Sequence, residues 1–375
     1  MFEQVDIPLS GNYSSALGWD SDAGSRDTGF SRQGTTGNEG ESIVWQNSLN
    51  VNYGFKLKGR NSLGFGANYS NLFYFNPAPG VDQMDHNARV SLRYSRQVNR
   101  SLTVSNATYV SYETEPNYDI GLSVTRPTSG YFLGSNRLSA NYQWNRRFST
   151  VTGYSFSTIL YEDQSLDNES YYRNSLTQDF RYAFKRRLSG TLSYRYNWTV
   201  YEDNDEGDSV TQSVLAGLDY QWNRRLSVSG KAGVDYRAYD GEQDSEVAPR
   251  VEVGLSYILA KRTSASWRNL LSLDDTGRAG SQTGYSYRSS FGLSHGFSRR
   301  LGGSLSLNYI HSDYGNSVDG LEDGVEDTIY TGLSLNYMLW RNISLNANYN
   351  YSFSTADGQE DYSRHRLFVG MSYAF

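Results

Sequence analysis

The chain has 375 residues, a formal net charge of −6 and no cysteine, which excludes disulfide bonds, thiol catalysis and zinc–thiolate sites. Apolar residues make up only 37% of it, yet aromatic residues reach 15%, so neither a large soluble core nor a disordered chain fits. No apolar run is long enough to predict a transmembrane helix. The opening residues, Met1-Phe2-Glu3-Gln4, do not resemble a signal peptide.

Alternation of apolar and polar residues predicts eighteen β-strands. In chain order they cover residues 10–19, 42–57, 61–75, 84–97, 101–112, 131–144, 148–161, 171–184, 188–201, 209–222, 226–239, 247–259, 263–273, 283–297, 301–314, 328–339, 343–353 and 362–375. Residues 120–125 are a candidate for one small extra hairpin. Short basic turns such as Asn145-Arg146-Arg147 and Asn223-Arg224-Arg225 recur about every 40 residues, with longer acidic connections between them.

Long strands joined by short turns on one side and longer loops on the other are typical of an outer-membrane barrel. A β-propeller, which also repeats about every 40 residues, needs four short strands per repeat, and only two long ones are found here. Residues 1–375 are therefore predicted to form a single domain, an all-β, antiparallel, up-and-down transmembrane barrel of about eighteen strands. An even strand number places both ends of the chain at the periplasmic, short-turn side.

Aromatic residues flank the predicted turns and loops, where the two interfacial girdles of such a barrel belong. On the turn side these are Tyr142, Trp144, Phe148, Tyr220, Trp222, Tyr257, Phe297 and Trp340. On the loop side they are Tyr112, Tyr161, Tyr201, Tyr239 and Tyr314.

Strand parity separates lipid-facing from lumen-facing positions, because successive side chains point to opposite faces. In residues 188–201 one face is apolar and aromatic and the other carries Ser, Thr, Asn and Arg, so the second face must line a lumen. The same parity points these basic residues inward: Lys56, Arg89, Arg93, Arg137, Arg173, Arg181, Arg195, Lys231, Arg237, Arg250, Arg268, Arg288, Arg364 and Arg366. It also points four acidic residues inward: Asp179, Asp219, Asp235 and Glu252.

Fourteen lumen cations against four anions give an expected surplus of about +10, which leaves two interpretations open. The arginines set pore selectivity by focusing a positive field on solutes. Alternatively they are structural, and pairs such as Asp179–Arg181 and Asp235–Arg237 simply neutralise one another on the wall.

Metal and catalytic sites find little support in the sequence. The acidic connections 162–170, 202–209, 240–246 and 319–327 are either solvated loops or sites for oxygen-seeking cations, and they lack the EF-hand register. In the tripeptide His311-Ser312-Asp313 the side chains alternate between faces and cannot align as a triad. We therefore expect no cofactor, no metal and no enzymatic activity.

The segment Ala140-Asn141-Tyr142-Gln143-Trp144-Asn145-Arg146-Arg147-Phe148-Ser149 and the ending Gly370-Met371-Ser372-Tyr373-Ala374-Phe375 resemble β-barrel porin family 2. Members of that family are Tyr-rich outer-membrane barrels of Gram-negative bacteria, often encoded with exopolysaccharide export machinery. The resemblance implies that Tyr373 and Phe375 form the signal for the barrel-assembly machinery. It assigns no catalytic residue.

The resulting expectation is a bacterial outer-membrane channel that passes an anionic exopolysaccharide as part of a secretion system. The alternatives are a general diffusion porin for small, preferentially anionic solutes, and a sheath around a partner such as a multihaem electron conduit. Expected partners are outer-membrane lipid and lipopolysaccharide, the barrel-assembly machinery and periplasmic polysaccharide-export components, without nucleic acid.

Overall fold

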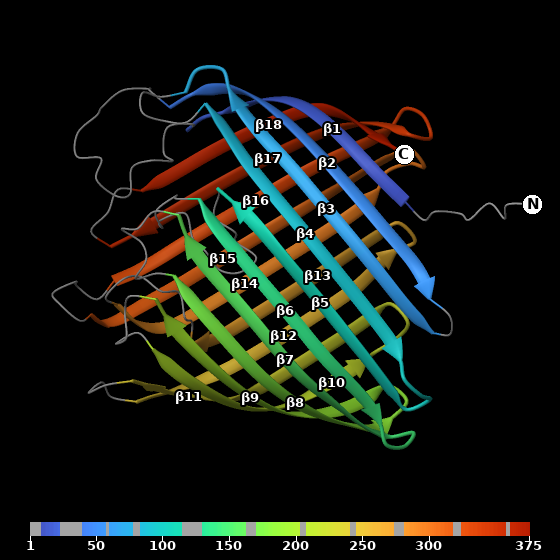
Figure 1. Ribbon diagram of the computed structural model, residues 1–375, viewed down its shortest axis with the longest axis vertical. Helices are drawn as coiled ribbons and strands as arrows, with labels where there is room; N and C mark the ends of the chain where they lie inside the picture. Colours follow the sequence, from blue (N-terminus) through green and yellow to red (C-terminus); the bar gives the residue numbers. More distant parts are fainter. Residues whose placement is uncertain are drawn as a thin grey trace, which may run out of the picture.

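The computed structural model is a closed barrel of eighteen antiparallel strands in one sheet, which confirms the predicted fold class (Figure 1). It describes residues 9–22, 40–57, 60–77, 83–114, 130–162, 170–202, 208–240, 245–273, 281–317, 324–357 and 361–375, with backbone only at 55–57, 281–283 and 314–317. The strands are β1 (Leu9–Asp20), β2 (Ser42–Leu57), β3 (Asn61–Tyr74), β4 (Met84–Gln97), β5 (Leu102–Glu113), β6 (Tyr131–Gln143), β7 (Phe148–Tyr161), β8 (Tyr171–Lys185), β9 (Leu188–Tyr201), β10 (Ser209–Gln221), β11 (Leu226–Tyr239), β12 (Glu246–Ala260), β13 (Thr263–Leu273), β14 (Ser281–Gly296), β15 (Leu301–Ser317), β16 (Gly324–Met338), β17 (Ile343–Ala356) and β18 (Tyr362–Ala374).

Each strand pairs with the next one in the sequence, and β1 pairs with β18 to close the sheet. The strands tilt across the barrel (Figure 1), and the start of β1 and the end of β18 lie at one rim. We call this end, which carries the turns at 98–101, 144–147, 222–225 and 297–300, the turn rim, and the opposite end the loop rim. No helix among the described residues is long and apolar enough to cross a membrane.

The recurring Asn of the basic turns has a direct structural role. Asn145 Oδ1 accepts hydrogen bonds from the backbone N–H groups of Arg147 and Phe148, at 2.8 and 3.0 Å. Asn99 and Asn223 repeat this arrangement, and Ser298 does so through its hydroxyl. A side chain that satisfies backbone donors two and three residues on fixes a tight reversal, which explains why the motif recurs.

The strands extend further at the loop rim than the sequence predicts. β16 begins at Gly324 rather than residue 328, and β15 and β17 end at Ser317 and Ala356 rather than 314 and 353. Alternation weakens there because both faces of the sheet become polar near the rim. The candidate hairpin at 120–125 lies outside the described residues.

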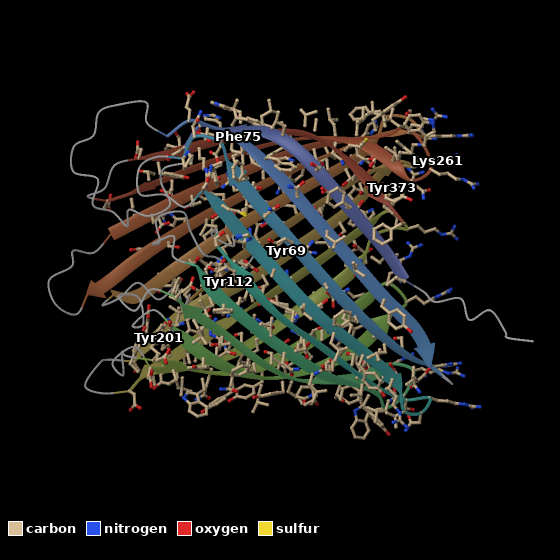
Figure 2. The ribbon with its side chains drawn as sticks, turned by 45° about the horizontal axis from the view of Figure 1, so that its top comes forward. Tyr69, Phe75, Tyr112, Tyr201, Lys261 and Tyr373 are labelled. Atoms are coloured by element: carbon tan, nitrogen blue, oxygen red, sulfur yellow. The ribbon has the colours of Figure 1, made fainter. Side chains whose placement is uncertain are left out.

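The outward face is apolar and aromatic, as a lipid-facing wall must be. At the turn rim Trp144, Trp222, Phe297 and Trp340 are each about 60% exposed. Figure 2 shows Lys261 at the turn rim and Tyr201 near the opposite one.

The predicted girdle at the loop rim is wrong for Tyr161, Tyr201 and Tyr239. Tyr239 has the same parity as the buried residues Asp235 and Arg237 on its strand, and Tyr201 has the same parity as Thr199 on its own. The strand pairings place Tyr161 on this same face, so all three side chains face the lumen. Tyr112 does face outward and packs against Phe132, with ring centroids 5.1 Å apart. The side chain of Tyr314 lies outside the described residues.

The seam between β1 and β18 closes on the last residue. Gly11 and Phe375 exchange two backbone hydrogen bonds, of 2.8 and 2.9 Å. The Phe375 ring covers Gly11, where a Cβ would lie 2.2 Å from the ring, and it stacks near Tyr373. Any side chain at position 11 would displace this ring.

Candidate functional site in the lumen

The strand register places the sequence-predicted charges on the lumen face, opposite the exposed apolar side chains. On that face lie the basic residues Arg89, Arg93, Arg137, Arg173, Arg181, Arg195, Lys231, Arg237, Arg250, Arg268, Arg288, Arg364 and Arg366, with the acidic residues Asp179, Asp219, Asp235 and Glu252. The backbone position of Lys56 has the same parity, but its side chain is outside the described residues.

Five further acids face the lumen and were missed in the sequence: Asp20, Asp85, Glu113, Glu246 and Glu326. Four of them fall one or two residues beyond the predicted strand ends, so parity was not applied to them. The fifth, Asp85, lies inside a predicted strand, where parity alone would have found it. Thirteen basic against nine acidic strand side chains leave a surplus of four among the described residues, smaller than the +10 expected.

A buried ion pair joins the two strands of the seam at the loop rim. Arg364 donates two hydrogen bonds to the carboxylate of Asp20, of 2.9 and 2.6 Å, and Arg366 approaches the same carboxylate at 3.4 Å. Beside it Phe368 is 4% exposed and its ring contacts Gly18, where a Cβ would lie 2.4 Å from a ring atom. Both guanidinium groups therefore share one buried carboxylate at the seam.

A second network occupies the wall formed by β9 to β12. Arg195 binds both carboxylate oxygens of Glu252, at 2.6 and 3.3 Å, and spans two intervening strands to do so. Arg250 bridges Glu252 and Asp235, at 3.1 and 3.2 Å. The fully buried Ser213 beneath this bridge leaves room for the long side chains to lie along the wall. Paired guanidinium and carboxylate groups of this kind largely cancel one another's field.

Other lumen charges are also held to the wall. Arg237 is 1% exposed and donates to Thr211, Arg173 donates to Thr199, and Lys231 donates to Ser193. Arg181 pairs with Asp179 at 3.3 Å, and Asp219 accepts from Thr191 at 3.4 Å. Arg288 lies half-buried at mid-height on β14.

Four lumen arginines differ from these wall-bound residues. Arg89, Arg93, Arg137 and Arg268 are exposed and have no ion pair within the described residues. Arg93 and Arg137 both lie level with Ala107 on the strand between them, which places their Cα atoms about 10 Å apart. Arg89 is four residues along β4 from Arg93, about 13 Å away.

The guanidinium of Arg89 sits 3.9 Å from the ring centroid of Tyr109, a cation–π contact that fixes its position and leaves its charge uncancelled. We call Arg89, Arg93 and Arg137 the arginine cluster.

The wall bearing the arginine cluster is aromatic toward the loop rim. Tyr131 packs against Tyr161 and Tyr171 against Tyr201, with centroids 5.8 and 5.7 Å apart. Tyr131, Tyr161 and Tyr201 are nevertheless buried, so they stiffen the wall.

The adjoining wall, on β15 to β18 and β1 to β3, is mostly uncharged between the rims. It contains a recess of about 440 Å³ whose lining includes Ser306, Ser334, Asn348, Asn350, Tyr330 and Phe368. Tyr330 donates to Asn350 at 2.9 Å. Amides and hydroxyls thus line the lumen beside the arginine cluster.

The tripeptide His311-Ser312-Asp313 forms no triad. His311 faces outward and contacts Asp327 at 2.9 Å, and Tyr309 donates to the same carboxylate. Ser312 is buried on the lumen face, across the sheet. Within the described residues no group of three His, Asp or Glu side chains could hold a metal ion.

A family model described as "Putative beta-barrel porin 2" matches residues 132–259 and 255–375. The chain belongs to this family. It is a bacterial outer-membrane β-barrel porin, as the resemblance implied. No curated protein matches the sequence of this chain.

Solved structures share the fold of this porin at low sequence identity. The BenF-like porin of Pseudomonas fluorescens Pf-5 has a TM-score of 0.52 and 12% identity over 99% of both chains. Pseudomonas aeruginosa OccK9 (OpdG) has a TM-score of 0.51 and 10% identity over 99% of both chains. OccK1 (OpdK) of the same species has 0.51 and 12%, over 98% of the porin and 99% of its own chain.

Proposed function

We propose that the porin is a passive diffusion channel for small solutes that prefers anions. The observation that carries this proposal is the contrast between the two kinds of lumen charge. Asp20, Asp235 and Glu252 are engaged by guanidinium groups at the wall, whereas the arginine cluster is exposed and unpaired among the described residues. A diffusing solute therefore meets more positive than negative charge.

The low-dielectric wall strengthens this preference, because it focuses the field of the cluster into the water-filled lumen. An eighteen-stranded barrel is too wide for side chains to fill, so the field acts on solutes in a continuous aqueous path.

The test is ion selectivity in planar bilayers, read from the reversal potential in a KCl gradient. The wild-type porin should favour chloride, and the combined Arg89→Gln, Arg93→Gln and Arg137→Gln variant should shift the reversal potential toward zero. Arg96→Gln is the matched control, since Arg96 lies on β4 with outward parity and removes the same charge outside the lumen. Cation preference, or no conductance at all, would overturn the proposal.

Passage of an anionic exopolysaccharide is a second candidate. The uncharged wall supports it, because amides and hydroxyls beside Tyr330 and Phe368 suit the hydroxyl groups and apolar ring faces of sugars. A deletion strain separates the two candidates: an exporter's deletion removes surface polymer and leaves the uptake of small anions unchanged, and a diffusion channel's deletion does the reverse.

A further inference from the structure

Four neighbouring strands carry polar side chains at mid-height on the outward face, where lipid is expected. Asn106 and Thr108 lie on β5, Asn136 on β6, Thr152 on β7 and Gln178 on β8. We call these five residues the amide patch. They surround the exposed Leu138, which lies level with Asn106.

The patch satisfies only part of its own hydrogen-bonding capacity. Asn136 Nδ2 donates to Thr108 Oγ1 at 2.6 Å, and Asn106 Nδ2 donates to Asn136 Oδ1 at 3.4 Å. Thr152 donates to Gln178 at 2.7 Å. Each side-chain amide has two N–H donors, so Asn106 and Asn136 each keep one that no described residue accepts. Hydrocarbon offers no acceptor, and leaving such a donor there costs free energy.

Outward amides on the rest of the described wall are arranged differently. Asn47, Gln212 and Asn269 each accept a hydrogen bond from a neighbouring tyrosine hydroxyl, at 3.0, 3.1 and 2.8 Å. Asn71 lies opposite Asn47, but it donates to the sulfur of Met84 and not to the Asn47 amide. Only on β5 and β6 do two amides bond to each other. This wall therefore differs in chemistry from the lipid-facing remainder.

We propose that the amide patch is the contact between two copies of this chain, related by a two-fold axis along the membrane normal near Leu138. Such an axis brings each height of the wall against the same height of the second copy. Asn, Gln and Thr each carry both a donor and an acceptor, so the patch is complementary to itself. The outward positions of β5 to β8 between the rims carry no charge, so the two copies do not repel each other.

The wall is large enough for a specific contact. Four strands about 4.8 Å apart over a band about 25 Å tall offer roughly 500 Å² per copy. Two such walls reach the total of about 1,000 Å² that a specific interface needs. The inference does not depend on what the lumen transports.

The absence of native cysteine makes single-cysteine cross-linking a clean test. Leu138→Cys places a thiol at the centre of the patch without removing any of its polar groups. Leu333→Cys on β16 is the matched control, because Leu333 is similarly exposed and also lies five residues from the turn-rim end of its strand. Both variants are treated in outer-membrane vesicles with a short bismaleimide, and heat-modifiable migration in gels confirms that each barrel is folded.

Leu138→Cys is expected to shift from 42.3 kDa to twice that mass, and Leu333→Cys is expected to stay monomeric. No shift for Leu138→Cys, equal shifts for both variants, or a product of another mass would each overturn the proposal. A second variant, Asn106→Leu with Asn136→Leu, tests whether the patch contacts a second copy or lipid. Light scattering in detergent measures the mass of this variant. Loss of the dimer supports an interface, and a dimer unchanged in mass and stability contradicts it.

Discussion

Two ion pairs of the lumen wall show how burial decides what a single residue contributes. The side chains of Arg364 and Asp20 are 7% and 1% exposed, whereas those of Arg181 and Asp179 are 48% and 18% exposed. Removing one partner of a buried pair leaves the other charge without water or a counter-charge. The attraction between the partners of an exposed pair is instead weakened by water and salt. The first pair therefore contributes to stability, and the second hardly does.

Asp20→Asn should lower the free energy of unfolding by about 3–5 kcal/mol, because it leaves the buried guanidinium of Arg364 without its carboxylate. Asp179→Asn, the control at an exposed pair, should change it by less than about 1 kcal/mol. Urea unfolding of the barrel in lipid vesicles, followed by tryptophan fluorescence, measures both. Equal effects of the two substitutions would contradict the distinction.

At the scale of elements, the sequence predicted the strands, their number and the faces of their mid-strand residues, because alternation is strong wherever lipid covers one side. The sequence-based assignment of faces and strand ends was wrong at the loop rim. Tyr161 and Tyr201 were assigned to a lipid-facing girdle although they point inward, and Asp20 and Glu326 fell outside the predicted strands. At a rim water reaches both faces, so polarity no longer reports orientation.

Pairing between strands that are not neighbours along the lumen wall could not be predicted from the sequence either. Arg195 and Glu252 meet across two intervening strands, through the concave curvature of the wall. Periodicity records which face a residue occupies but not how far round the barrel its side chain reaches. The sequence suggested Asp235–Arg237 instead, whereas Asp235 binds Arg250.

The turn motif gives a prediction at the same scale. Asn145→Ala removes the acceptor for two backbone N–H groups and should destabilise the β6–β7 hairpin by about 1 kcal/mol. Arg146→Ala in the same turn removes an exposed side chain that forms no hydrogen bond or ion pair with the described residues, and it should be neutral. Hydrogen exchange at the N–H groups of Arg147 and Phe148 reports the loss, and equal exchange in both variants would refute this role.

For the whole molecule, the balance of lumen charge should be adjustable from the paired network as well as from the arginine cluster. Glu252→Gln removes a negative charge and releases Arg195 and Arg250 from their common partner. Anion preference in bilayers should therefore rise. Asp313→Asn, which removes a charge from the outward face near the loop rim, should leave it unchanged.

The selectivity should also depend on ionic strength. The Debye length falls from about 10 Å at 0.1 M salt to about 3 Å at 1 M, shorter than the spacing of the arginine cluster. The chloride-to-potassium permeability ratio should therefore approach one as KCl is raised. A ratio independent of salt would point to a narrow steric filter instead of a long-range field.

The closure of β1 on β18 has a consequence for how the barrel forms. Each of the other strand pairings joins sequence neighbours, whereas this one brings Gly11 to Phe375 across the entire chain. Loop-closure entropy makes such a contact the slowest to find, and until it forms the two edge strands expose unpaired backbone groups. Assembly is therefore expected to end at the seam, where the buried Asp20–Arg364 pair and the Phe375 side chain stabilise the closed barrel.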